Sequence, residues 1–294
     1  MTRTWFITGA NRGLGRAFTT AALAQGDRVV ATARDPKTME DLRDERLTVL
    51  PLDVRDRGAV IDTVNAAFDK VGTIDVIINN AGYGLVGALE ELTEAEIRDQ
   101  MDTNFYGALW VSQAAVPHLR AQGSGHIVQI STVGAVGSLP LFGLYNASKW
   151  ALEGFSASLA DELRPFGIHV TLAQMGGFDT DWAKSSMKFG TELPAYTEQR
   201  QALFGMPDYW GPLVQAESAH TPDESAPSTH EPAEAPESTE PGPEVAAAAI
   251  LDLVAMPNPP VRKVIGPGAH QMVTMALDAR RQDYLTDPEF TWPA

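Results

Sequence analysis

The first 33 residues contain the feature that most restricts the fold, a strand, a glycine-rich turn, a helix and a second strand in immediate succession. Residues 4–8 (TWFIT) have the composition of a short buried strand, and the turn at 9–15 (GANRGLG) follows. A helical pattern then runs to Leu23 and ends near Gly26, before a second strand at 28–33. Two strands joined through a helix in about thirty residues form a βαβ unit, which predicts a parallel sheet.

The glycines of this turn, Gly9, Gly13 and Gly15, have a physical task. They let the backbone come close to a pyrophosphate, whose charge is met by free N–H groups at a helix N-terminus. Similar turns also occur where nothing binds. The place of this turn between a strand and a helix nevertheless favours a dinucleotide site.

Strands and helices continue to alternate along the chain. Further strands are predicted at 47–50, 75–78, 126–130, 168–173 and 261–265, and further helices at 39–44, 59–68, 94–118, 145–164, 245–255 and 270–283. Thr93 is the expected N-cap of the longest helix, with Glu96 completing a capping box. This rhythm predicts an α/β fold, a doubly wound parallel β-sheet with helices on both faces, in a single domain spanning 1–294.

Ligands of such sheets bind beyond the carboxyl ends of the strands. Several residues that follow a predicted strand therefore line up along one edge of the sheet: Gly9, Arg34, Asp53, Asn80, Ser131 and Gly176.

Charge and composition narrow the functional classes. The net charge of −16 argues against nucleic acids and anionic membranes as partners. No cysteine is present, which excludes disulfides and fits a reducing cytoplasm, and the six histidines show no metal-ligand spacing. The first apolar run enters a glycine turn directly, and no apolar run is long enough to cross a bilayer. We therefore expect a cytoplasmic protein without a signal peptide or bound metal.

Much of the acidity belongs to one segment. Residues 201–261 contain ten Asp and Glu and no Lys or Arg. Within this span, 215–243 is rich in Pro, Glu, Ser and Thr and lacks large apolar residues, so we interpret it as a disordered acidic insertion inside the domain. It is either an inert insertion or a regulatory or docking segment.

Tyr145 and Lys149 stand four residues apart at the start of a predicted helix, which places them on one helical face. A cation beside a phenol favours the phenolate and lowers its pKa towards the range of efficient acid–base catalysis. Taken alone, the pair also fits the wet side of an amphipathic helix.

The motifs together resemble the short-chain dehydrogenase/reductase family. They occur in the family's order as Thr8 to Gly15 (TGANRGLG), Asn79 to Gly82 (NNAG), Asn104, Ser131, and Tyr145 with Lys149. The resemblance covers nearly the whole chain outside the acidic insertion. It implies a Rossmann-like fold and an NADP-preferring, carbonyl reductase-like activity on a small-molecule carbonyl or alcohol.

The resemblance also implies roles for four residues. Tyr145 would donate a proton to a carbonyl oxygen as hydride arrives, or accept one in the reverse direction. Lys149 would lower the tyrosine pKa and hold the nicotinamide ribose. Ser131 would orient the substrate oxygen, and Asn104 would bend its helix and anchor a water leading from Lys149 to solvent.

The charge after the second strand bears on the cofactor. Ala33 stands where NAD-dependent relatives carry Asp, and Arg34 and Arg12 supply cations suited to a 2′-phosphate, although Asp35 lies next to Arg34. We therefore expect NADP(H) rather than NAD(H). The cofactor residues implied are Gly9, Asn11, Arg12, Gly13, Leu14, Gly15, Arg34, Asp53, Val54, Asn80, Ala81, Gly82, Tyr145, Lys149, Gly176 and Thr180.

After the sixth strand the sequence departs from the family pattern, because Met175 replaces the usual proline while Thr180 is retained. The departure adds a backbone donor and flexibility beside the nicotinamide site. Residues 178–210 are the expected substrate lid, rich in aromatic residues. The substrate pocket is predicted at Leu141, Phe142, Gly177, Phe178 and Trp182.

Three functions follow. The leading prediction is reversible, NADPH-dependent reduction of a ketone or aldehyde. A second uses the same Tyr–Lys pair for non-redox chemistry, as an isomerase, dehydratase or cyclase, motivated by Met175. A third is a non-catalytic NADP-sensing protein whose acidic insertion docks a partner. By analogy with relatives, we also expect a homo-oligomer, a dimer or tetramer through the helices at 94–118 and 145–164.

Overall fold

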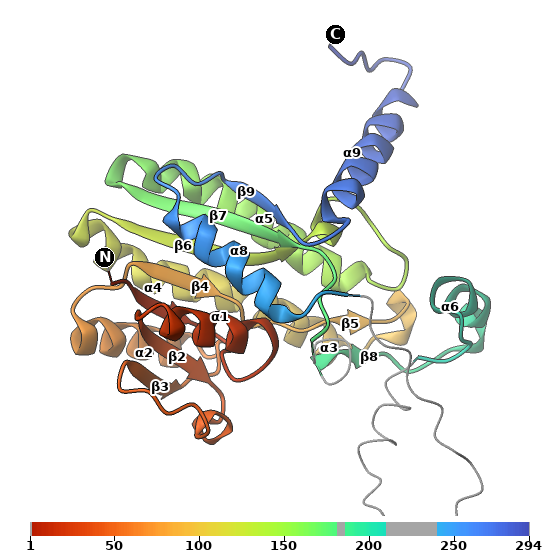
Figure 1. The fold of residues 1–294 in the computed structure, drawn as a ribbon. Helices are drawn as coiled ribbons and strands as arrows, with labels where there is room; N and C mark the ends of the chain where they lie inside the picture. The colour runs from red at the N-terminus through yellow and green to blue at the C-terminus, as the bar shows by residue number, and fades with distance from the viewer. Residues whose placement is uncertain (1, 181–185, 210–239, 294) are drawn as a thin grey trace, which may run out of the picture.

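The computed structural model describes residues 2–180, 186–209 and 240–293. Their core is a seven-stranded sheet in the order β3-β2-β1-β4-β6-β7-β9, with every neighbouring pair parallel (Figure 1). The strands are β1 Thr4–Ile7, β2 Arg28–Ala33, β3 Leu47–Pro51, β4 Val76–Asn79, β6 Gly125–Thr132, β7 Ile168–Met175 and β9 Arg262–Ile265. The predicted doubly wound parallel sheet is confirmed.

Helices cover both faces of the sheet. On one face, α1 (Gly13–Ala24) and α8 (Pro243–Ala255) pack through side chains such as Phe18 and Ile250. On the other face lie α2 (Arg57–Val71), α4 (Gly107–Gln122) and α5 (Gly143–Leu163). Because both faces are covered, the central strands are buried along most of their length, and all four residues of β1 are buried.

The direction in which strands are added reverses between β1 and β4. In doubly wound sheets, this switch opens a crevice beyond the carboxyl ends of the strands. The loop after β1 and the loop after β4 border that crevice, so the glycine turn and Asn80 face each other across it.

The predicted helix at 94–118 is present but is interrupted. α3 (Glu94–Met101) gives way to one π-helical segment, η3 (Asp102–Tyr106), before α4 begins. The predicted capping box is confirmed, because the Thr93 N–H donates to Glu96 Oε2 at 2.8 Å and the Glu96 N–H donates to Thr93 Oγ1 at 3.3 Å. Asn104 lies in the π segment, where its helix was expected to bend.

The predicted helix at 39–44 is wrong. The chain forms a short 3-10 turn, η1 (Pro36–Met39), whose first N–H groups are met by the Asp35 side chain, which accepts from the Lys37 N–H at 3.0 Å. Pro36 starts this turn with a fixed φ. Buried Met39 then anchors the connection, and β3 begins eight residues later.

Smaller elements lie beside the crevice. A second, two-stranded parallel sheet joins β5 (Leu85–Val86) to β8 (Lys188–Phe189), and α6 (Thr197–Phe204) follows (Figure 1). Short 3-10 turns are η2 Leu89–Glu91, η4 Val133–Ala135, η5 Arg164–Phe166 and η7 Pro194–Tyr196. The last helix, α9 (Ala269–Leu285), projects from the body.

The acidic insertion predicted at 215–243 falls mostly outside the described residues, which resume at Glu240. The first helix after it, α8, begins at Pro243. Among the helices in the described ranges, none has the length and apolar character that a membrane crossing requires.

Candidate functional site

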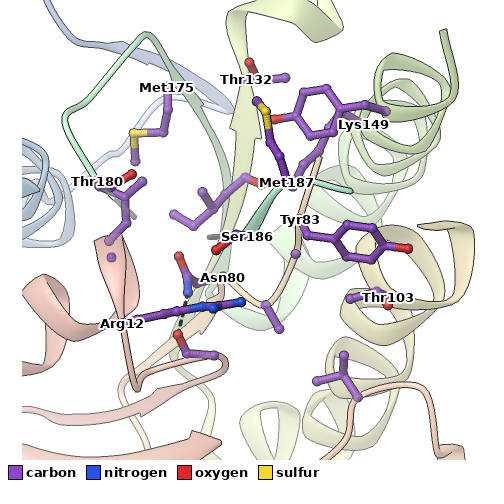
Figure 2. Close-up of a pocket in the computed structure, with 18 of the residues that line it drawn as sticks. Arg12, Asn80, Tyr83, Thr103, Thr132, Lys149, Met175, Thr180, Ser186 and Met187 are labelled. Atoms are coloured by element: carbon purple, nitrogen blue, oxygen red, sulfur yellow. Dashed lines mark hydrogen bonds between the residues drawn. The ribbon is translucent and has the colours of Figure 1, made fainter. Parts of the chain in front are cut away.

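A cavity of about 540 Å³ occupies the crevice beyond the strand ends. It extends from the glycine turn and Arg34 at one end to Tyr145 and Lys149 at the other, and Met187 and Lys188 of the segment predicted as a lid also line it. Figure 2 shows Arg12 at one end, with Thr132 and Lys149 at the opposite end. Residues predicted from separate motifs therefore share one cavity.

The glycine turn has the backbone that its residue types suggest. Gly9 and Gly13 both have positive φ, +62° and +50°. A Cβ on Gly15 would lie 2.3 Å from the Gly9 carbonyl oxygen, so only glycine allows this close approach. From the facing loop, the Asn80 side-chain amide donates to the carbonyl oxygens of Thr8 and Gly9 at 3.0 Å each. These bonds hold the turn against the loop after β4, and Gly9 and Gly13 line the cavity.

The N-terminus of α1 is suited to an anion. Its N-cap residue, Arg12, makes no side-chain capping bond, and no acidic residue stands in its first turn. Arg12 and Arg34 both line the cavity, and Ala33 ends β2 beside them. A helix N-terminus with two cations nearby fits phosphate groups.

The carboxylate of Asp53 is engaged by a neighbour that the sequence analysis did not single out. Arg55 donates to it through Nε at 3.0 Å and Nη2 at 2.6 Å, and these bonds lower the pKa of Asp53. Arg55 also pairs with Asp99 of α3. All three residues line the cavity.

Asp99 connects this end of the site to the lid. Besides Arg55, it accepts from Lys188 Nζ of β8 at 2.7 Å and from the Tyr83 hydroxyl at 2.8 Å. These donors hold the pKa of Asp99 down at about 2, against the effect of its burial. Lys188 Nζ also stands 4.5 Å from the centre of the Tyr83 ring. The sequence analysis missed this group because its members are far apart in the chain.

Lys149 is buried at the other end of the cavity. Its Nζ donates to the Ile130 carbonyl oxygen at 2.8 Å, and it passes close to Gly82, where a Cβ would lie 3.6 Å from that nitrogen. Burial lowers the pKa of Lys149 to about 8, and the charge of Glu153 opposes this change.

Tyr145 is buried beside the Thr132 side chain. Burial raises the pKa of Tyr145 to about 12, and a hydrogen bond from Thr132 works in the opposite direction. The expected net lowering of this pKa by Lys149 is therefore absent, because desolvation of the phenolate outweighs the favourable contacts. The Thr132 oxygen itself accepts from the Gly134 N–H at 3.2 Å, so its single hydroxyl proton is available to an acceptor oxygen at this end of the cavity.

Ser131 lines the cavity, and its expected role towards a substrate oxygen stays a prediction. Its hydroxyl donates to Glu153 Oε1 at 2.8 Å, so its proton is committed to a buried carboxylate. The adjacent Thr132 supplies the hydroxyl beside Tyr145. Serine and threonine carry the same group, and residue type alone does not say which of two neighbours on a strand faces the reacting position.

Asn104 contributes to the architecture around the site. Its Nδ2 donates to the Tyr83 carbonyl oxygen at 2.9 Å and to Ser148 Oγ at 3.1 Å, and its Oδ1 accepts from the Tyr83 N–H at 3.0 Å. The side chain joins the π segment, the loop after β4 and α5, behind the cavity wall.

The wall after β7 contains the predicted Gly176, Gly177 and Thr180 together with Met175. Figure 2 shows Met175 and Thr180 on the same side of the cavity. Glu240, which the sequence analysis assigned to the acidic insertion, also lines this wall. Its carboxylate approaches Gly177 so closely that a Cβ there would lie 2.0 Å from Oε1.

The predicted substrate residues divide into three groups. Gly177 and Phe178 line the cavity. Leu141 and Phe142 belong to an apolar cluster with residues of the predicted lid segment. The centre of the Phe142 ring lies 6.4 Å from that of Tyr145 and 6.2 Å from that of Phe204. Trp182 lies outside the described residues.

A buried ion pair joins the segment predicted as a lid to the body of the domain. Arg200 Nη1 of α6 donates to Glu91 Oε1 at 2.7 Å, and the Tyr209 hydroxyl donates to Glu91 Oε2 at 2.6 Å. The backbone N–H groups of Ala88 and Leu193 complete the carboxylate's partners, both at 2.8 Å. The Arg200 and Glu91 side chains are only 2% and 0% exposed, so the pair is shut away from water.

Comparisons with known proteins agree with this geometry. The family described as "short chain dehydrogenase" matches residues 3–189. Oxidoreductase BOA17 of Botryotinia fuckeliana is 38% identical over 95% of this chain and 94% of its own length. A 3-ketodihydrosphingosine reductase of Bacteroides thetaiotaomicron is 34% identical over 96% of this chain and 92% of its own length. The crystal structure of a short-chain dehydrogenase from Streptomyces avermitilis has a TM-score of 0.80 at 34% identity, covering 97% of this chain and 95% of that one.

Proposed function

Because the chain belongs to the short-chain dehydrogenase family, we propose that it is an NADP(H)-dependent oxidoreductase that reduces a ketone or aldehyde to an alcohol, reversibly. The observation that carries this proposal is the single cavity with an anion-binding helix N-terminus at one end and Thr132, Tyr145 and Lys149 at the other.

The cavity residues fit a dinucleotide phosphate. Gly15 lets the turn approach the Gly9 carbonyl oxygen, which a Cβ would obstruct, and the N-terminus of α1 carries neither a side-chain cap nor an acid in its first turn. Arg12 and Arg34 supply the charge for a 2′-phosphate, and Ala33 places no carboxylate there. These features support NADP(H) over NAD(H).

A nicotinamide held in this cavity would supply the hydride for the carbonyl carbon, or take up the hydride of the alcohol in the reverse direction. The Tyr145 hydroxyl donates its proton to the carbonyl oxygen, and Thr132 donates a hydrogen bond to that oxygen as negative charge develops on it. The high pKa of Tyr145 keeps the phenol protonated at neutral pH, which suits the reductive direction. Lys149 holds a positive charge beside the site and is placed to contact the nicotinamide ribose.

The substrate is a weakly polar carbonyl compound or alcohol. Support comes from the lid, where Phe189, Phe204 and Tyr209 pack with Phe142 next to Tyr145. The 3-ketodihydrosphingosine reductase relative is named for the reduction of a ketone. An apolar enclosure excludes water and strengthens the hydrogen bonds made to the substrate oxygen.

The test is NADPH oxidation, followed by absorbance, with a panel of aromatic and aliphatic ketones and aldehydes of increasing size. We expect substrate-dependent oxidation that Tyr145→Phe reduces by at least about a hundredfold, since this variant removes the proton donor. The matched control is Tyr106→Phe, which removes a half-exposed hydroxyl on η3 away from the cavity lining. Full activity in Tyr145→Phe contradicts the proposal.

Non-redox chemistry remains the second candidate because Met175 lines the wall where relatives carry proline. Substrate turnover without any net change in the NADP redox state, still dependent on Tyr145, favours an isomerase or dehydratase. Measurement of the deuterium content of the product formed with deuterated NADPH separates the two cases, because only the reductase transfers deuterium to carbon.

A further inference from the structure

Three consecutive residues at the end of β6 are each held by a different residue of α5. Lys149 Nζ binds the Ile130 carbonyl oxygen, Glu153 accepts from Ser131, and Tyr145 meets Thr132. Tyr145, Lys149 and Glu153 follow one another at intervals of four residues, so they lie along one helical face. The proposed reaction uses Tyr145 and Lys149, but it gives Glu153 no part.

Glu153 is a buried carboxylate with a full set of donors. Besides Ser131, Gln174 Nε2 of β7 donates to Oε1 at 3.0 Å, and Arg262 Nε of β9 donates to Oε2 at 2.9 Å. Ser131 and Gln174 are register partners in neighbouring strands, so their side chains emerge on the same face of the sheet. The glutamate therefore fastens three adjacent strands to the helix that carries the proposed acid.

The charged neighbours of Glu153 differ in their exposure to solvent. The side chain of Glu153 is 9% exposed, whereas that of its partner Arg262 is 50% exposed and is largely screened by solvent. Lys149 lies one helical turn away on the buried side, and β6 and β7 present the neutral groups of Ser131 and Gln174. The attraction between Glu153 and the buried Lys149 is therefore less screened by solvent than that between Glu153 and Arg262.

We propose that Glu153 is a positioning residue for the proposed reaction: its carboxylate fixes the β6 segment that presents Thr132, and its negative charge keeps the buried Lys149 ammonium protonated. The role of this charge rests on the proposed function, but the state of Lys149 can be measured without turnover. Burial favours neutral lysine, and a nearby carboxylate opposes that tendency.

The direct test is a ¹³C-lysine NMR titration of the cofactor-free protein, with the Lys149 signal assigned from Lys149→Arg. Glu153→Gln keeps the shape and removes the charge, and we expect the Lys149 midpoint to fall by about 1 pH unit. Arg262→Gln removes the opposing cation, so it raises the midpoint. Glu162→Gln, a control that removes an exposed carboxylate from the same helix, leaves it unchanged.

The second readout is the pH profile of kcat/KM, whose alkaline limb moves in the same direction as the NMR midpoint in each variant. A merely structural Glu153 would give losses of stability in Glu153→Gln and Arg262→Gln without these opposite shifts. A midpoint in folded Glu153→Gln equal to that of the wild type overturns the proposal. If Glu153→Gln does not fold, Arg262→Gln decides, and an unmoved midpoint there overturns it. Absence of turnover in the wild type refutes the proposed function while leaving the NMR result intact.

Discussion

The hydroxyl of Ser131 donates to Glu153 Oε1 at 2.8 Å, while the next residue along β6, Thr132, supplies the hydroxyl beside Tyr145. Two neighbouring hydroxyls of similar chemistry thus point to different partners. One is bound into a buried carboxylate network, and the other stands beside the proposed proton donor of the carbonyl reduction.

This division predicts unequal costs for removing the two hydroxyls. Thr132→Ala should lower kcat/KM by about a hundredfold, because it deletes a donor to the oxygen on which charge develops. Thr132→Ser should retain most of the activity. Ser131→Ala should cost no more than about fivefold. Steady-state kinetics at one pH checks all three variants, and a larger loss in Ser131→Ala than in Thr132→Ala would reverse the assignment.

The lowered pKa of Lys149 predicts that this residue contributes to stability in a pH-dependent way. Its folded pKa of about 8 lies below the 10.5 of a solvated lysine, so between these values the unfolded chain binds more protons than the folded chain. The contribution of Lys149 to the free energy of unfolding therefore rises with pH through this window and is constant below it. At neutral pH, the buried ammonium is a cost to the fold.

Urea unfolding of the wild type and Lys149→Met at pH 7 and pH 10 isolates this contribution from other titrating groups. The free energy of unfolding of the wild type, relative to that of Lys149→Met, should be about 2 kcal/mol higher at pH 10 than at pH 7. The variant should be inactive at both values. A difference that is constant with pH contradicts the lowered pKa of Lys149.

The elements that the sequence predicted well are those set by local pattern. The apolar run of β1, the glycine turn and the capping box at Thr93 each depend on residues within one turn or strand, and each is present. The residues of the glycine turn that line the cavity were named for the same reason. The helix predicted at 39–44 failed because Pro36 and the buried Met39 produce a tight connection instead.

The parts that escaped prediction depend on contacts between distant segments. Asp99 joins Arg55 to Lys188 across the cavity rim, and nothing in the local sequence of α3 marks that residue. Glu91 appears in the sequence as an ordinary acidic residue before a helix, yet it is sealed beneath the lid by Arg200. Tertiary packing alone distinguishes these carboxylates from their exposed neighbours.

The position of Arg34 in the cavity predicts that its charge favours NADPH over NADH. Arg34→Gln should raise the dissociation constant for NADPH by about tenfold to a hundredfold, the range of a charged hydrogen bond, and leave that for NADH nearly unchanged. Arg28→Gln is the control, since it removes an exposed arginine from the opposite end of β2. Fluorescence titration of both cofactors measures the effect. Equal weakening of NADPH and NADH would assign Arg34 to the shared pyrophosphate.

The buried pair of Glu91 and Arg200 makes the lid sensitive to the loss of one charge. Glu91→Gln leaves the Arg200 guanidinium buried without its counter-ion, so the free energy of unfolding should fall by about 3–5 kcal/mol. The double variant Glu91→Gln/Arg200→Met should recover most of this loss, because neither charge is then left alone. Glu94→Gln, at an exposed pair on α3, should have little effect.

Limited proteolysis locates the effect in the lid, since cleavage within 186–209 should accelerate in Glu91→Gln before the sheet unfolds. KM should rise more than kcat falls, because the lid encloses the substrate and the proton donor lies on α5. If the double variant were as unstable as the single one, the hydrogen bonds from Tyr209 and the backbone to Glu91, rather than its charge, would account for the stability of the lid.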